Sequence, residues 1–96
     1  MKIRILNEAE QDLVDGAVFY EAQDAGLGSY FLDSLSADID SLQLFAGIHP
    51  IRLGYHFLLA SRFPYAIYYR IVKQVAHVEA VLDCRRDPAW IEKRLR

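Results

Sequence analysis

Hydrophobic and polar side chains alternate along much of the second half of the chain, where Tyr, Phe, Ile and Val are frequent. Aromatic and β-branched residues suit the pleated, half-buried surface of a β-sheet. Pro64 interrupts this pattern as a strand's first residue would, and Lys73–Gln74 interrupts it again as the tip of a hairpin. The pattern predicts an antiparallel meander of three strands, at about 55–60, 64–72 and 75–83.

The alternation also assigns side chains to the two faces of this meander. One face should be apolar and formed by Ile67, Tyr69, Ile71, Val78, Ala80 and Leu82. The other face should be mixed and formed by Ala66, Tyr68, Arg70, His77 and Glu79. The apolar face needs a cover, whereas the mixed face carries groups that are available for function.

Two stretches of the first half have apolar residues at helical spacing. A helix over about 8–23 has the apolar stripe Ala9, Leu13, Ala17 and Tyr20, widened by Val14 and Phe19. A second helix over about 29–45 repeats Phe31, Leu35, Ile39 and Leu42, while Ser34 is among the residues that should point away. Gly26 can end the first helix in the left-handed conformation. Such a helix hairpin is a natural cover for the apolar face of the sheet.

Short elements are expected at both ends of the chain. Residues 2–6 alternate as a strand does, and Asn7 and Glu10 follow at the spacing of a capping box. Near the other end, Asp87 and Pro88 are typical of the N-cap and first position of a helix, here over 89–95. Trp90 and Leu95 are the expected anchors of that helix.

The predicted order of elements is therefore β-α-α-β-β-β. This order describes an α+β fold in which a helix hairpin packs on a mostly antiparallel four-stranded sheet, followed by a short C-terminal helix. The 96 residues, of which 53% are hydrophobic, suffice for the core of one domain spanning 1–96.

The composition fits a reducing compartment. The one cysteine, Cys84, cannot form an internal disulfide framework. No apolar run approaches the roughly 20 residues of a membrane span, and the start of the chain is too charged for a signal peptide. We expect a cytoplasmic protein.

Charge is distributed unevenly along the chain. Residues 1–50 contain two basic and nine acidic residues, a net charge of −7, whereas residues 51–96 contain nine basic and four acidic residues, a net charge of +5. Such a chain can present a basic surface to a polyanion although its overall net charge is −2. Alternatively, the acids and bases are solvated faces of the helices and strands.

Several motifs occur in a characteristic order along nearly the whole chain. They are Ala17–Glu21, Gly26–Gly28 with Phe31, Arg62–Tyr65 followed by Ile67–Tyr69, and Arg85–Pro88 with Trp90 and Arg94. In this combination the chain resembles the RelE/ParE superfamily of bacterial type II toxin–antitoxin toxins, some of which serve in plasmid stabilisation. The resemblance implies a toxin that binds a cognate antitoxin tightly and is silent in that complex.

The resemblance implies two classes of target. RelE-like members cut mRNA in the ribosomal A site without a metal, and ParE-like members poison DNA gyrase. One fold thus serves both, and the fold alone cannot choose between them. We expect growth inhibition of the ParE-like kind, with a RelE-like, ribosome-dependent mRNA endonuclease and a non-toxic binding module of the same fold as the alternatives.

Cleavage of RNA through its 2′-hydroxyl needs a base, a proton donor and cations that stabilise the phosphorane. By resemblance, Arg62 lies near the sheet arginine of the nucleases, and Arg85 or Arg86 lies at the arginine that follows the last strand. Strand 55–60 lacks the lysines of those nucleases, which leaves His56 as the candidate base.

The candidate contacts with a target form a larger set. They are Arg62, Arg70, Arg85, Arg86, Trp90 and Arg94. Alternatively, Arg85 and Arg86 pair with Asp83 and Asp87 in exposed salt bridges of little energetic value, and Trp90 serves only in packing. The three histidines and Cys84 show no zinc spacing, so neither a metal nor another cofactor is expected.

Overall fold

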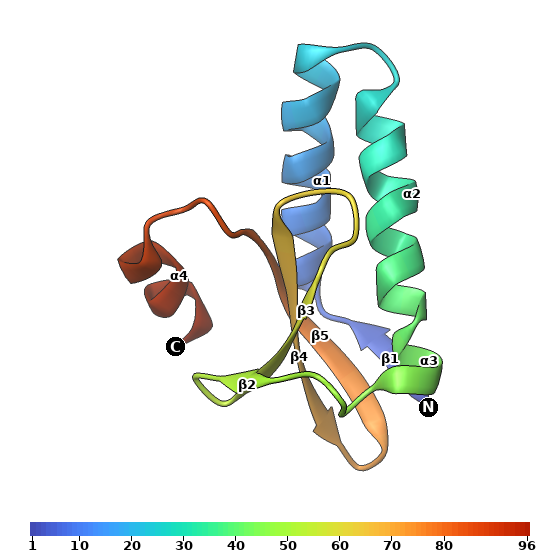
Figure 1. Ribbon diagram of the computed structural model, residues 1–96, viewed down its shortest axis with the longest axis vertical. Coiled ribbons are helices and arrows are strands. Elements are labelled where there is room, and N and C mark those ends of the chain that lie inside the picture. Colours follow the sequence, from blue (N-terminus) through green and yellow to red (C-terminus); the bar gives the residue numbers. More distant parts are fainter.

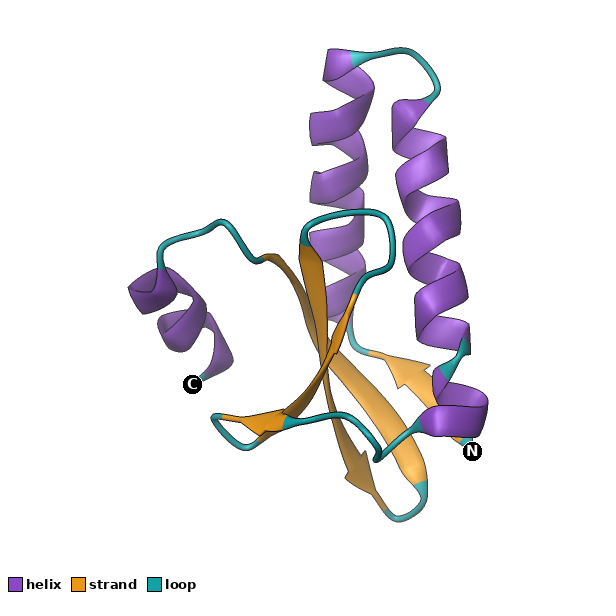
Figure 2. Ribbon diagram, in the orientation of Figure 1, coloured by secondary structure: helices purple, strands orange, loops and turns teal.

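A five-stranded sheet lies between two layers of helix in the computed structural model, which describes residues 1–96 (Figure 1; Figure 2). The elements are β1 (Lys2–Ile5), α1 (Asn7–Gln23), α2 (Leu27–Asp40), α3 (Leu42–Phe45), β2 (Ile51–Arg52), β3 (Tyr55–Leu59), β4 (Tyr65–Val72), β5 (Val75–Asp83) and α4 (Pro88–Leu95). The strand order is β1-β5-β4-β3-β2, and only β1 and β5 are parallel. The predicted helix hairpin on a mostly antiparallel sheet is confirmed. None of the helices is both long enough and apolar enough to cross a membrane.

The prediction of four strands was wrong by one, because β2 adds a short edge strand. Its two residues pair with β3 through a turn at Leu53 and Gly54, where φ is 55° and 83°. Pro50 accepts a further hydrogen bond from the Phe57 N–H at 2.9 Å. Two residues are too few to show an alternating pattern, so no sequence pattern indicates this strand.

The ends of the first helices differ from the predicted ones. Asn7 is already helical and makes no side-chain cap, because the chain enters α1 directly from β1 at Leu6. The second helix begins at Leu27 and breaks at Ser41, whose hydroxyl donates to the Asp38 carbonyl at 2.6 Å. Such side-chain bonds compete with the helical ladder. Gly26 has the expected left-handed conformation, with φ at 88°.

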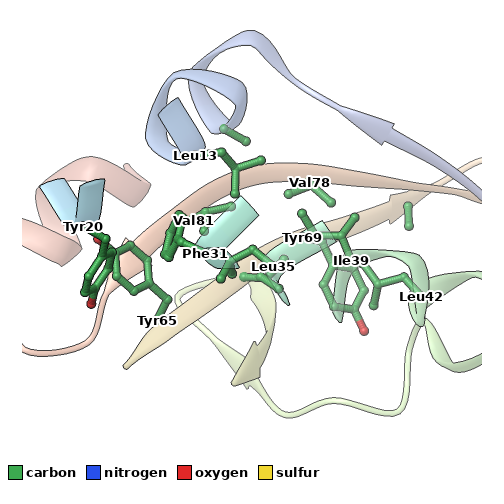
Figure 3. Packing of buried hydrophobic residues seen from close by; sticks show 13 residues of the cluster. Leu13, Tyr20, Phe31, Leu35, Ile39, Leu42, Tyr65, Tyr69, Val78 and Val81 are labelled. Carbon is green, nitrogen blue, oxygen red and sulfur yellow. The ribbon is translucent and has the colours of Figure 1, made fainter. Parts of the chain in front are cut away.

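The main core lies between the helix hairpin and the sheet, as Figure 3 shows. Phe31, Leu35, Ile39 and Leu42 are fully or almost fully buried, as predicted. Two predictions for α1 were wrong: Val14 and Phe19 are half-exposed, and Gly16 is buried against the Phe31 ring instead. Ser34 also differs from the prediction, since it is buried, and its hydroxyl has no partner.

A β-bulge changes the faces of the sheet halfway along β5. Tyr68 pairs with Ala80 and Tyr69 pairs with Val78, which leaves Glu79 as an extra residue. Strict alternation therefore failed for Ala80 and for Leu82, which turn to the face opposite the helix hairpin.

The face predicted to be mixed consequently holds a second apolar cluster, which α4 covers. This cluster contains Ala66, Tyr68, Ala80, Leu82, Ile91 and Leu95. Asp87 caps α4 as predicted, because its carboxylate accepts from the Ala89 N–H at 2.9 Å, and Pro88 begins the helix. Leu95 is a buried anchor, but the second one is Ile91, and Trp90 is only partly buried.

Gly28 permits the close contact between α1 and α2, which gives a testable prediction. A Cβ at this position would lie 2.6 Å from the Ala17 carbonyl oxygen and 2.9 Å from the Glu21 Cβ. Gly28→Ala should therefore lower the free energy of unfolding, measured in urea, by about 1–3 kcal/mol. The exposed neighbour is the control: Ser29→Ala should change it by less than about 0.5 kcal/mol. Equal stabilities of the two variants would contradict this account of the contact.

Candidate functional site

Three of the predicted cationic residues lie in two loops at one end of the sheet. Arg62 is in the β3–β4 loop, and Arg85 and Arg86 are in the β5–α4 loop (Figure 1). The loops are joined by a hydrogen bond from the Cys84 N–H to the Pro64 carbonyl, at 2.7 Å. We call these two loops, residues 60–64 and 84–87, the basic end of the sheet.

A row of aromatic rings connects the arginines of the basic end. Tyr30, Phe63 and Tyr20 follow one another with centroid distances of 5.6 and 4.8 Å. Arg62 donates to the Tyr30 hydroxyl at 3.3 Å, and Arg85 donates to the Tyr20 hydroxyl at 3.4 Å. These tyrosines come from α1 and α2, and no short-range pattern in the sequence pairs them with residues so far along the chain.

The three arginines differ in what remains free for a partner. Asp83 accepts two hydrogen bonds from the Arg85 guanidinium, at 3.0 and 2.8 Å. These bonds lower the pKa of Asp83 and raise that of Arg85, so this guanidinium is already neutralised. Arg62 and Arg86 make no salt bridge. They are the unpaired cations of the basic end.

Trp90 lies next to the basic end and contacts one of these cations, Arg86. The Arg86 guanidinium lies over the Trp90 ring, 3.9 Å from its centroid, as in a cation–π contact. One face of the indole is therefore occupied, and stacking by a target base there would first have to displace Arg86.

The two other predicted contacts, Arg70 and Arg94, are not part of the basic end. Arg94 donates to both carboxylate oxygens of Asp12 at 2.8 Å, which joins α4 to α1. Arg70 donates to Glu79 at 2.6 Å and lies over the Tyr55 ring. Asp12 also accepts from the Val81 N–H at 3.0 Å, so Arg94 completes a connection among α1, β5 and α4.

His56 likewise lies apart from the predicted arginines, inside a cluster with His49 and Tyr69. Its Nδ1 donates to the His49 carbonyl at 2.8 Å, and its ring stacks on Tyr69 at a centroid distance of 5.1 Å. The Tyr69 hydroxyl accepts from the Gly47 N–H at 2.9 Å and also bonds to His49 Nδ1. Since the Tyr69 oxygen already accepts one hydrogen bond, we assign Tyr69 as the donor in its bond with His49. The Nδ1 of His49 is then unprotonated and accepts that bond.

A cleft of about 430 Å³ lies beside the basic end, between α1, β5 and α4. Its walls combine charged and aromatic side chains: Asp12, Asp15, Phe19, Tyr65, Asp83, Arg86, Trp90 and Arg94. Burial raises the pKa of Tyr65 to about 12, so this hydroxyl stays protonated at neutral pH. Nowhere in residues 1–96 do three His, Cys, Asp or Glu side chains form a group that could hold a metal ion.

Comparison with solved structures identifies the fold. A chain from the chromosomal ParDE toxin–antitoxin system of P. aeruginosa superposes with a TM-score of 0.75 at 17% sequence identity, over 84% of this chain and 92% of that one. The chain shares the fold of that ParDE chain. The fold predicted from the sequence motifs is thereby confirmed. No protein-family model matches the sequence, and no curated protein matches it either.

The Asp12–Arg94 pair gives a prediction for stability. Arg94→Met should lower the free energy of unfolding by about 1–2 kcal/mol, because a largely buried carboxylate loses its charged partner while some solvent still reaches it. The adjacent Lys93 is exposed and makes no salt bridge, so Lys93→Met should cost less than about 0.5 kcal/mol. Urea unfolding measures both variants, and a loss no larger in Arg94→Met than in Lys93→Met would refute a structural role for this pair.

His49 gives a prediction for pH dependence. Burial and, second, repulsion from His56 lower its pKa from the ordinary value of 6.5. The contribution of neutral His49 to stability is therefore complete above pH 6.5 and is lost as the pH falls through the lower pKa of the folded state. Between about pH 7.5 and about pH 5, the wild type should lose more free energy of unfolding than His49→Gln, which cannot titrate there. The wild type and the variant have all other titrating groups in common, so equal losses of stability in both proteins would contradict the lowered pKa of His49.

Proposed function

We propose that this chain is the toxin of a type II toxin–antitoxin module and that it inhibits growth by ParE-like poisoning of DNA gyrase. In this proposal a cognate antitoxin binds and silences it in the cytoplasm. The RelE/ParE-type fold, shared with a chain of the ParDE system, supports the toxin class. Since one fold serves several activities, the choice of target has to come from the residues of the site.

One observation carries the choice of gyrase over mRNA: the basic end holds no histidine or lysine that could act as a general base near neutral pH. Its carboxylate, Asp87, caps α4, and burial raises the pKa of its thiol, Cys84. Its arginines are cations at any physiological pH. Burial keeps Tyr65 protonated, and the Asp83 carboxylate is engaged by Arg85. The candidate base His56 is bonded through Nδ1 to His49 and stacked on Tyr69, within a different cluster. Cleavage through a 2′-hydroxyl needs such a base within hydrogen-bond reach of the hydroxyl.

A RelE-like ribonuclease is the second candidate, and the unpaired Arg62 and Arg86 favour it. Two guanidinium groups beside a row of aromatic rings are suited to phosphates and splayed bases. The same pair of cations could equally contact an acidic protein surface. Both candidates therefore assign the target contact to Arg62 and Arg86 and differ in whether RNA is cut.

Induction of this chain in a bacterium without antitoxin tests the proposal. We expect growth arrest with intact mRNA, together with gyrase-dependent double-strand breaks in plasmid DNA. Arrest with mRNA cut at codon-phased positions would identify the ribonuclease instead. Unimpeded growth would leave only the non-toxic binding module.

Paired variants test the role of the basic end in the same assay. Arg62→Gln combined with Arg86→Gln should relieve the arrest, because the two unpaired cations of that end are removed. Lys73→Gln combined with Lys93→Gln removes the same charge elsewhere and should remain toxic. Full toxicity of both double variants would exclude the basic end as the target contact.

A further inference from the structure

Residues 44–53 form an apolar strip whose large side chains belong to neither core. Leu44, Ile48 and Ile51 are 83, 73 and 67% exposed, and Phe45 and Leu53 are about half-exposed. Figure 1 shows this segment running from α3 to β2 across the sheet, at the end opposite the basic end. So many large apolar side chains exposed in ten residues are unusual for a protein that functions alone.

The strip is held in a fixed conformation by the interior of the protein. The Gly47 N–H donates to the buried Tyr69 hydroxyl at 2.9 Å, and His49 bonds to the same hydroxyl. The His49 carbonyl accepts from His56 at 2.8 Å. Ile48 stands between these two anchored positions and remains exposed. A surface that is already ordered loses little conformational entropy when a partner binds, so the strip is suited to docking.

The turn at the end of the strip is unfavourable for the residue it contains. Leu53 has a φ of 55°, in the left-handed region where two-residue hairpin turns normally use Asn, Asp or Gly. Its side chain is nevertheless half-exposed and contributes to neither core. A large apolar residue kept in such a conformation at the surface is consistent with a contact to another molecule.

The charges around the strip indicate the chemistry of that molecule. The chain contains no Asp or Glu between Asp40 and Glu79. Arg52, within the strip, and Lys73, at the tip of the β4–β5 hairpin, are exposed and make no salt bridge. A complementary partner is therefore apolar and acidic. Nucleic acid fits poorly, because the surface is mainly aliphatic and has few cations.

The shape of the strip indicates an extended partner segment. β2 is the last strand of the sheet, so its outer edge is open. Arg52 and Tyr55 flank the two-residue turn and face each other across the ladder, so the N–H and C=O of Ile51 point to the open edge. An added strand could bond to these groups while its apolar side chains contact the strip.

We infer that the strip is a docking site for an acidic, apolar, extended segment of the antitoxin, which adds along β2. The inference rests on the proposed function, because it takes the partner to be an antitoxin. It assigns the antitoxin to the end of the sheet opposite Arg62 and Arg86.

The test measures binding of the protein encoded beside this chain's gene, purified and added to the full-length chain. Ile48→Asp combined with Ile51→Asp should raise the Kd at least about tenfold, since two exposed apolar contacts are replaced by repelled carboxylates. Arg52→Glu should also weaken binding, and its effect should shrink at high salt. The positions are exposed, so circular dichroism and urea unfolding should match the wild type.

Val14→Asp combined with Val18→Asp is the matched control, because it places two carboxylates on exposed apolar positions of α1. We expect its Kd to stay within about twofold of the wild type. Unchanged binding by the strip variants, or equal losses in strip and control variants, would overturn the inference. So would a strip variant that binds the antitoxin normally but no longer arrests growth, since the strip would then contact the target. Absence of binding by the wild type itself would count against the proposed function.

Discussion

One extra residue in β5 determines how the two layers of helix share the sheet. At Glu79 the ladder between β4 and β5 shifts, so that Val81 faces the helix hairpin while Ala80 and Leu82 face α4. Without this bulge, strict alternation would place Ala80 and Leu82 under α1 and α2, and the second cluster would lose its centre. The bulge thus creates the apolar surface on which α4 packs.

The shortness of β1 adds a second constraint next to the bulge. β1 ends opposite Val78, so the edge of β5 beyond that residue has no strand beside it. The Val81 N–H, which no neighbouring strand pairs, donates to the carboxylate of Asp12 from α1. Arg94 then neutralises that carboxylate, which fixes α4 at a definite distance from α1 and leaves the cleft between them. A backbone group that must find a partner therefore holds Arg94 in the contact between α1 and α4 rather than at the basic end.

The fold was predictable from the sequence because its main elements obey local rules. Phe31, Leu35 and Ile39 repeat at helical spacing, and Asp87–Pro88 begins a helix by residue type alone. The bulge at Glu79 was not predictable, since a single extra residue leaves the local composition of a strand unchanged.

The candidate site was predictable only where sequence neighbours decide the outcome. The ion pair of Asp83 and Arg85 follows from their spacing and was an open alternative from the start. Pairs such as Asp12 with Arg94, or Tyr30 with Arg62, depend on residues far apart in the chain that only the folded structure brings together. A list of arginines therefore could not separate the unpaired Arg62 and Arg86 from those already bound to carboxylates.

The uneven charge of the chain acquires a spatial meaning in the folded protein. Three carboxylates of the first half are used within the fold: Asp12 binds Arg94, Asp38 accepts from the Ser61 N–H, and Glu21 accepts from Gly26 and Gly28. The segment between Asp40 and Glu79, which has no Asp or Glu, keeps unpaired cations at both ends of the sheet. Arg62 lies at the basic end, and Arg52 and Lys73 lie near the strip. At the basic end these are combined with aromatic rings, and at the strip they are combined with aliphatic side chains. Two surfaces of such different chemistry are suited to two different partners, as the proposed function, with a target and an antitoxin, requires. An antitoxin bound at the strip would leave Arg62 and Arg86 uncovered, so silencing would require that its remaining chain extend over the basic end or block the approach of the target.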